Sequence, residues 1–314
     1  MVKKILKPKP KIVIILGPTA SGKTALGVKL AAEFNGEIIS ADSRQVYRGM
    51  DIGTGKDLSE YRIDKQEIPY HLIDIISPNT KFNLARYQKL ALKAINDILS
   101  RGKLPIIVGG TGLYLQALAD NYKLSDVKDN RQVRLDLEKK TTAELWKILI
   151  DIKPDFAVKL NNSDKNNPRR LVRYIEIISG SGDMVQKKSS ALFNFLILGI
   201  NIDDEKMKAK ILARLTHRLD REDMISEVKA LKQAGVSYPR LISFGLEYKF
   251  ISYFLQNKIG REEMIEKLGN AIYRFAKKQK TWFRRWEKQG KKIEWITSLN
   301  EGSKKIKEFL KASD

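Results

Sequence analysis

Residues 17–24 read Gly17-Pro18-Thr19-Ala20-Ser21-Gly22-Lys23-Thr24, which fits the phosphate-binding pattern G-x-x-x-x-G-K-[ST]. Residues 11–16 before this loop are rich in Ile and Val and predict a buried β-strand, and residues 25–34 after it predict a helix. Backbone N–H groups, the helix dipole and the Lys23 ammonium would then converge on one spot. We expect a diphosphate or triphosphate there, with Thr24 as a ligand of Mg²⁺. A tight strand-to-helix turn without a ligand is the alternative.

The segments on both sides of this loop predict an α/β fold. Short connections between alternating strands and helices imply a parallel sheet with helices on both faces, and ligands bind at the carboxyl ends of such strands. The predicted elements are strands at 36–40, 70–76 and 104–108, an amphipathic helix at 83–99, and a second glycine-rich turn at 109–112.

The alternation stops near Asp120 and gives way to helical segments. An apolar run at 193–202 then predicts a strand that returns to the sheet. We therefore expect a core formed by residues 1–121 and 193–314, with a helical insertion domain at 122–192. Further helices are predicted at 142–150, 154–159, 169–179, 206–233 and 265–286.

The composition restricts the partners and the chemistry. Lys and Arg number 59 against 37 Asp and Glu, and the net charge of +22 favours a polyanionic partner, nucleic acid before an anionic membrane. A solvated basic surface is the alternative. The absence of cysteine excludes disulfides, thiolate zinc sites and a cysteine nucleophile. No apolar run approaches the roughly 20 residues that span a bilayer, so we expect no membrane contact and a soluble, cytoplasmic protein.

Asp42 follows the second predicted strand, so it would lie beside the phosphate loop and could accept a proton from a reacting group. A helix N-cap or a group that binds the water shell of Mg²⁺ are the other readings. No hydrophobic strand ends in the acid typical of an ATPase, and Asp74 is the nearest candidate. The phosphate compound would then donate a chemical group and would not be hydrolysed as an energy source.

Two clusters of cations favour contact with nucleic acid. Asn167 and Pro168 predict the start of a helix on which Arg169, Arg170 and Arg173 lie close together, and Glu176 alone could not neutralise all three. In residues 274–286 cations alternate with Phe275, Trp282 and Trp286, which suits phosphates and unpaired bases. Helical spacing also suits a core, and we expect the aromatics partly inward and the basic residues outward.

A third pair, Arg214 and Arg218, lies four residues apart and could reach a substrate phosphate, whereas the neighbouring His217 is expected on the surface.

Together these segments resemble the tRNA dimethylallyltransferase family, prenyltransferases that modify an adenine beside the anticodon. The match runs in order through 17–24, 42–54, 71–74, 108–114, the arginine helix from Pro168, and 277–284. Two regions depart from the family pattern. The segment after Arg214 to Asp220 is shorter than usual, and the family's Gly-Tyr-Lys element stands here as Gly245-Leu246-Glu247-Tyr248-Lys249.

The resemblance implies a fold like that of P-loop nucleoside triphosphate hydrolases and a monomer that uses Mg²⁺. Its loop would hold dimethylallyl diphosphate, and the prenyl group would pass to N6 of the adenine immediately 3′ of the anticodon. The catalytic residues implied are Asp42, Thr19 and Lys23, with Arg214 and Arg218 joining residues 17–24 on the diphosphate. The insertion would grip the anticodon stem-loop. The residues implied to bind tRNA are Asp42, Ser43, Arg44, Gln45, Thr111, Arg134, Arg169, Arg170, Leu171, Val172, Arg173, Lys277, Lys278, Gln279, Lys280, Thr281, Trp282, Phe283 and Arg284.

Three alternatives stay open on the residues alone. A small-molecule kinase could use the same loop for ATP, with Asp42 as the base. An adenylate isopentenyltransferase would modify a free nucleotide and would not need the arginine clusters. A non-catalytic RNA-binding NTPase would need the acid that the sequence does not supply.

Overall fold

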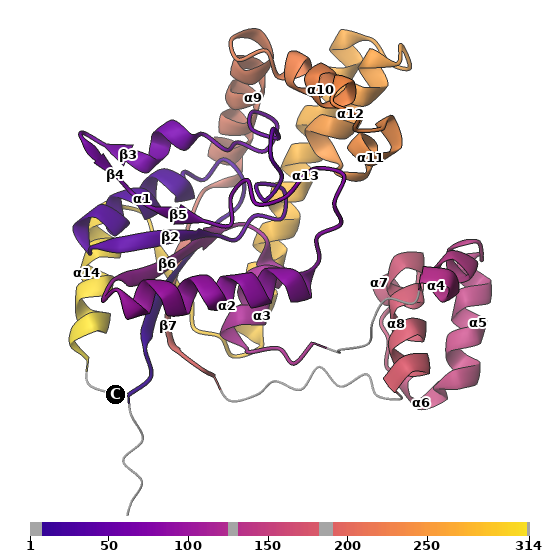
Figure 1. The fold of residues 1–314 in the computed structure, drawn as a ribbon, viewed down its shortest axis with the longest axis horizontal. Helices are drawn as coiled ribbons and strands as arrows, with labels where there is room; N and C mark the ends of the chain where they lie inside the picture. The colour runs from indigo at the N-terminus through magenta and orange to yellow at the C-terminus, as the bar shows by residue number, and fades with distance from the viewer. Residues whose placement is uncertain (1–7, 125–130, 182–190, 313–314) are drawn as a thin grey trace, which may run out of the picture. The chain divides into compact units, whose positions relative to one another are not determined.

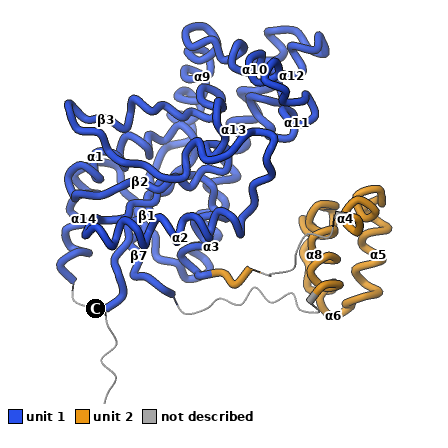
Figure 2. The backbone as a smooth tube through the Cα atoms, viewed as in Figure 1, with its two compact units in different colours: residues 1–121, 191–314 blue, residues 122–190 orange. Residues whose placement is uncertain are grey.

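The computed structural model describes residues 8–124, 131–181 and 191–312 (Figure 1). The chain divides into two compact units, which Figure 2 shows in different colours. The larger unit comprises residues 1–121 and 191–314, and the smaller comprises residues 122–190. The bounds of the smaller unit lie within two residues of those expected for the insertion.

Within the described residues of the larger unit, six parallel strands form the central sheet, which confirms the predicted fold class. They are β1 (Lys11–Leu16), β2 (Gly36–Ser40), β5 (Tyr70–His71), β6 (Leu104–Gly109), β7 (Asn194–Ile200) and β8 (Glu294–Ile296). Their order across the sheet is β5-β2-β6-β1-β7-β8, so β1 lies between two strands that come later in the chain. A separate antiparallel hairpin consists of β3 (Arg62–Ile63) and β4 (Gln66–Glu67).

Helices cover both faces of this sheet, because alternate residues of each strand point to opposite sides. Ile12 and Ile14 pack with α2 (Leu84–Ser100), α3 (Gly112–Ala119) and the end of α13 (Arg261–Lys288). Val13 and Ile15 pack on the other side with α1 (Lys23–Glu33) and α14 (Leu299–Lys311), as can be followed in Figure 1. The buried strands predicted at 11–16, 36–40 and 104–108 are thus confirmed.

A third apolar cluster lies among the helices that follow β7. It joins the first part of α13 to α9 (Asp204–Asp220), α10 (Met224–Gln233), α11 (Tyr238–Ser243) and α12 (Leu246–Leu255). The single helix predicted at 206–233 is wrong, because the chain leaves helical geometry at Asp223, whose φ is +53°. The Asp223 side chain accepts a hydrogen bond from the Ser226 N–H and so begins α10.

One strand prediction needs correction, and some elements were not predicted. The strand expected at 70–76 ends at His71, since Leu72 and Asp74 have φ values of +64° and +54° that no strand accommodates. A short 3₁₀ helix, η1 (Leu58–Tyr61), lies before the β3–β4 hairpin, and β8 and α14 complete the sheet and its cover at the C-terminus. The sequence analysis predicted none of the elements η1, β8 and α14.

The smaller unit is a bundle of short helices with an apolar core of its own, which includes Leu145, Leu149, Leu171 and Ile175. Its described helices are α4 (Arg131–Glu138), α5 (Thr142–Ile152), α6 (Pro154–Ala157), α7 (Asn162–Lys165) and α8 (Pro168–Ser181). Across the described parts of both units, every helix is too short or too polar to cross a membrane.

Candidate functional site

Three loops meet at the carboxyl edge of the sheet. Leu16 is paired with Gly109 and Gly199, and Ser40 is paired with Val108, so β1, β2 and β6 end side by side. The phosphate loop, Asp42 and the glycine-rich turn at 109–112 therefore meet at this edge, as the sequence predicts. The phosphate loop, Asp42 and the start of that turn line a cavity of about 430 Å³.

The phosphate loop is arranged to receive an anion. Gly22 has a φ of +82° and precedes the first turn of α1, and Lys23 and Thr24 line the cavity. Burial lowers the pKa of Lys23 to about 8; the nearby Asp42 carboxylate opposes this shift and Arg214 adds to it. Among the described residues, the buried Ser21 hydroxyl has no hydrogen-bond partner. The loop thus offers the titratable Lys23 ammonium to a ligand in the cavity, whereas Ser21 does not line the cavity.

Asp42 lines the same cavity and is only half-buried. One of its carboxylate oxygens accepts the Arg44 N–H at 2.9 Å, and the Ser43 N–H donates to the Thr111 hydroxyl at 3.1 Å. The residues that follow form a turn, which rules out the helix N-cap. Thr111 holds the Asp42 segment in place, a contact that the sequence did not suggest.

Arg214 and Arg218 reach the cavity from α9, as expected. Arg214 donates to the Thr19 hydroxyl at 2.5 Å, and burial lowers the pKa of Arg214 to about 10. Arg218 lies against Gly55, where an added Cβ would stand 2.4 Å from its Nη2. His217 is exposed beside Glu222, as predicted.

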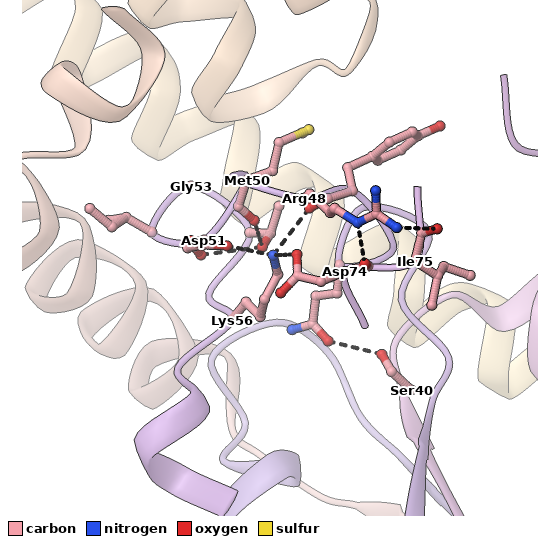
Figure 3. A network of polar contacts seen from close by, with 12 residues as sticks. Ser40, Arg48, Met50, Asp51, Gly53, Lys56, Asp74 and Ile75 are labelled. Carbon is pink, nitrogen blue, oxygen red and sulfur yellow. Dashed lines mark hydrogen bonds and ion pairs between the residues drawn. The ribbon is translucent and has the colours of Figure 1, made fainter. Parts of the chain in front are cut away.

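Residues 51–57 form a further wall of the cavity that the sequence analysis missed. Figure 3 shows the buried Lys56 ammonium between the carboxylates of Asp51 and Asp74, and it also donates to the Tyr47 carbonyl at 3.1 Å. The Arg48 guanidinium donates to the carbonyl of Asp74 at 2.9 Å. Asp74 is therefore committed to Lys56, and it does not line the cavity as an ATPase acid would.

Glu227 holds the same wall from α10. Its carboxylate accepts the backbone N–H groups of Asp51, Ile52 and Gly53 at 2.8, 2.6 and 3.1 Å, and the Tyr248 hydroxyl at 2.8 Å. Burial raises the pKa of Glu227, and these hydrogen bonds oppose the shift. The partners lie some 175 residues apart in sequence, so no local pattern could have paired them.

Arg44 and Gln45 also belong to the cavity wall. The Arg44 guanidinium donates to Glu247 at 2.9 Å and lies 5.7 Å from the centre of the Phe275 ring. Gln45 accepts from the Ser40 hydroxyl at 2.9 Å. The altered element Gly245–Lys249 thus supplies Glu247 to Arg44 and Tyr248 to Glu227.

Helix α13 divides the residues predicted at 277–284 between two faces. Lys277, Lys278, Thr281 and Arg284 are exposed, whereas Gln279 and Phe283 are buried. This bears out the expected arrangement of basic and aromatic residues. The Phe283 side chain is fully buried, and Gln279 lines the cavity at the sheet edge instead of the outer face of the helix. Lys280 is half-buried and donates to the Ile202 carbonyl and to Asp204, and Trp282 is also half-buried.

In the smaller unit, carboxylates neutralise more of the arginine cluster than the sequence suggested. Glu176 is buried and pairs with Arg134 at 2.7 Å and with Arg173 at 3.5 Å, while Arg170 pairs with Asp164. Arg169 is exposed.

A groove of about 490 Å³ lies on this unit, lined in part by Arg134, Lys140 and Arg169. Leu171, predicted to bind tRNA, is fully buried, and its side chain belongs to the apolar core of this unit. Val172, only 4% exposed, reaches the groove at its floor.

The cavity residues fit a Mg²⁺ ion that shares the oxygens of a diphosphate. Thr24, whose side chain carries a hydroxyl, lines the cavity. The described residues contain no cluster of three or more His, Asp or Glu able to hold a metal alone. Mg²⁺ commonly takes few protein ligands and completes its shell with substrate phosphates and water.

The fold and the cavity define an α/β protein of the P-loop class. A family model described as IPP transferase matches residues 45–286, and the chain belongs to this family. It is 46% identical to tRNA dimethylallyltransferase 1 of Syntrophus aciditrophicus, over 96% of this chain and 98% of that one. The identity to tRNA dimethylallyltransferase 1 of Parabacteroides distasonis is 44%, over 94% and 95% of the two chains.

Solved structures agree with this assignment. The tRNA isopentenylpyrophosphate transferase of Bacillus halodurans is 34% identical with a TM-score of 0.69, over 96% of both chains. A eukaryotic dimethylallyltransferase, described as acting on tRNA, is 27% identical with a TM-score of 0.75, over 93% of this chain and 75% of that chain.

Proposed function

We propose that this protein is a tRNA dimethylallyltransferase, which moves the dimethylallyl group of dimethylallyl diphosphate to N6 of the adenine immediately 3′ of the anticodon. The observation that carries the proposal is that the phosphate loop and Asp42 line one cavity at the sheet edge. Relatives that carry this name match nearly the whole chain, which supports the reaction and the tRNA substrate.

The cavity cations suit the leaving group. In the reaction the allylic C–O bond breaks and its electron pair departs with the diphosphate. Lys23, Arg214 and the loop N–H groups would stabilise the negative charge that develops there. Mg²⁺, held by Thr24 and the diphosphate oxygens, would supply further positive charge.

Asp42 suits the other half of the reaction. An adenine N6 amine is a poor nucleophile, because its lone pair is delocalised into the ring. As the N–C bond forms, the amine becomes positively charged and must lose a proton. The half-buried Asp42 carboxylate would hydrogen-bond the amine, orient it and accept that proton. The adenine has to leave its stack to reach this position.

Exposed cations suit the tRNA backbone. Lys277, Lys278 and Arg284 line the outer face of α13. The smaller unit offers a groove whose lining includes Arg134, Lys140 and Arg169. Both surfaces would bind phosphates without reading sequence, and the smaller unit would grip the anticodon stem-loop.

Label transfer tests the function directly. Incubation with labelled dimethylallyl diphosphate, Mg²⁺ and unmodified tRNA should move the label into tRNA, and AMP should receive none. Transfer to AMP alone would identify an adenylate isopentenyltransferase. ATP consumption without transfer would favour a kinase or an NTPase, and either outcome would refute the proposal.

A further inference from the structure

We propose that Gln279 is a positioning residue, which fixes the phosphate loop against helix α13 and the glycine-rich turn and thereby sets the donor site. The inference deepens the proposed function and rests on it. It gives Gln279 a role apart from the tRNA contact that its place among the basic residues of α13 predicts.

Both ends of the Gln279 amide are in use. Its Oε1 accepts the Thr19 N–H at 2.8 Å, and its Nε2 donates to the Gly110 carbonyl at 2.8 Å. The residue is only 8% exposed. One side chain thus joins the phosphate loop, which follows β1, to the turn that follows β6. The Arg214 guanidinium holds the hydroxyl of the same Thr19 from α9.

The contact between α13 and the turn leaves no room for a side chain. A Cβ on Gly110 would lie 2.3 Å from Gln279 Nε2 and 3.2 Å from the Gly17 carbonyl. A Cβ on Gly112 would lie 2.3 Å from the Trp282 ring. The glycines of this turn therefore admit α13 at a distance that lets Gln279 reach both loops.

The same turn also contacts the segment that contains Asp42. Thr111, between the two glycines, accepts the hydrogen bond of the Ser43 N–H. Gln279 therefore connects Thr19, on the diphosphate side of the cavity, with the turn that holds the Asp42 segment. The spacing between leaving group and base depends on this amide, while Lys278, the preceding residue of the helix, is exposed.

Two variants separate this role from tRNA binding. Gln279→Met keeps the size and removes both hydrogen bonds, whereas Gln279→Glu keeps the acceptor for Thr19 and loses the donor to Gly110. The matched control is Lys278→Met on the outer face. Calorimetry with inorganic diphosphate and Mg²⁺ measures the donor loop, filter binding measures tRNA, and steady-state transfer gives kcat and the KM for the donor.

Both Gln279 variants should weaken diphosphate binding at least tenfold and raise the donor KM, with the tRNA Kd unchanged within twofold. Lys278→Met should weaken tRNA binding and leave diphosphate binding and the donor KM unchanged. Gly110→Ala should displace the Gln279 amide and, combined with Gln279→Met, add little further loss. Gln279 variants that weaken tRNA binding and leave diphosphate binding intact would overturn the inference. A wild-type protein that binds diphosphate and tRNA without any transfer would instead refute the proposed function.

Discussion

The cations of the two units differ in how they are held. In the cavity of the larger unit, the buried Lys56 and the half-buried Arg44 pair with carboxylates, and burial lowers the pKa of Lys23 and of Arg214. In the groove of the smaller unit, Arg169 and Lys140 are exposed. Fixed, desolvated cations can stabilise charge at one point, because they need no reorganisation. Exposed cations add affinity for a long polyanion and are screened by salt.

The largest effect is expected from Asp42→Asn, which keeps the shape of the cavity and removes the base. The single-turnover rate of transfer should fall by about 10²–10⁴-fold, the usual contribution of a general base. The tRNA Kd should stay unchanged, as rapid quench and filter binding can establish. A loss of tRNA affinity with an intact chemical step would assign Asp42 to binding.

The pH dependence of diphosphate binding tests the role of the Lys23 ammonium. Because the pKa of Lys23 is lowered to about 8, the free protein loses this charge as the pH rises through 8. A bound anion favours the charged form, so binding takes up a proton. Affinity attributable to Lys23 should then fall up to about tenfold for each pH unit above 8. Calorimetry from pH 7 to 9.5 measures this loss, and Lys23→Met, the control for titration of diphosphate itself, should lack it.

Replacing a carboxylate by an amide should change stability more at the cavity wall than at the exposed groove. Glu227→Gln puts an amide where three backbone N–H groups need an acceptor, so the free energy of unfolding should fall by about 1–3 kcal/mol. Glu138→Gln, at the exposed groove, should change it by less than about 0.5 kcal/mol. Urea denaturation measures both values. Equal effects would mean that the cavity wall is no more rigidly built than the groove.

The smallest change is expected from the groove. Arg169→Gln combined with Lys140→Gln should weaken tRNA binding severalfold and reduce the slope of log K against log salt by about 0.9 for each lost phosphate contact. Diphosphate binding should not change. The matched control is Lys147→Gln, an exposed α5 residue apart from the residues that line the groove. An unaltered salt slope in the double variant would place the tRNA contacts elsewhere.

Local pattern predicted the sheet and the phosphate loop well. Residues 11–16 form a buried strand, and the ends of parallel strands must meet, so the sequence alone predicts Asp42 beside the phosphate loop, where the structure places it. The apolar pattern did not show where some elements end, because that depends on backbone geometry. The positive φ at Leu72, Asp74 and Asp223 ends elements that the apolar pattern alone would continue.

Long-range polar contacts could not be predicted in the same way. Glu227 and Gln279 look like ordinary polar positions on amphipathic helices, and only the fold shows which backbone groups they satisfy. The sequence suggests Glu176 as the acidic partner of the arginine cluster, and it does not suggest Asp164, because Asp164 lies before the helix begins. Arg134, which shares Glu176 with Arg173, comes from another helix.

The most direct test is single-turnover transfer from dimethylallyl diphosphate to an anticodon stem-loop with adenine 3′ of the anticodon, compared with the same RNA carrying guanine there. Nucleoside analysis should find the label only on N6 of that adenine, with one diphosphate released for each group transferred. Label on the guanine-bearing RNA, or at another adenine, would contradict the proposed placement of the base between Asp42 and the phosphate loop.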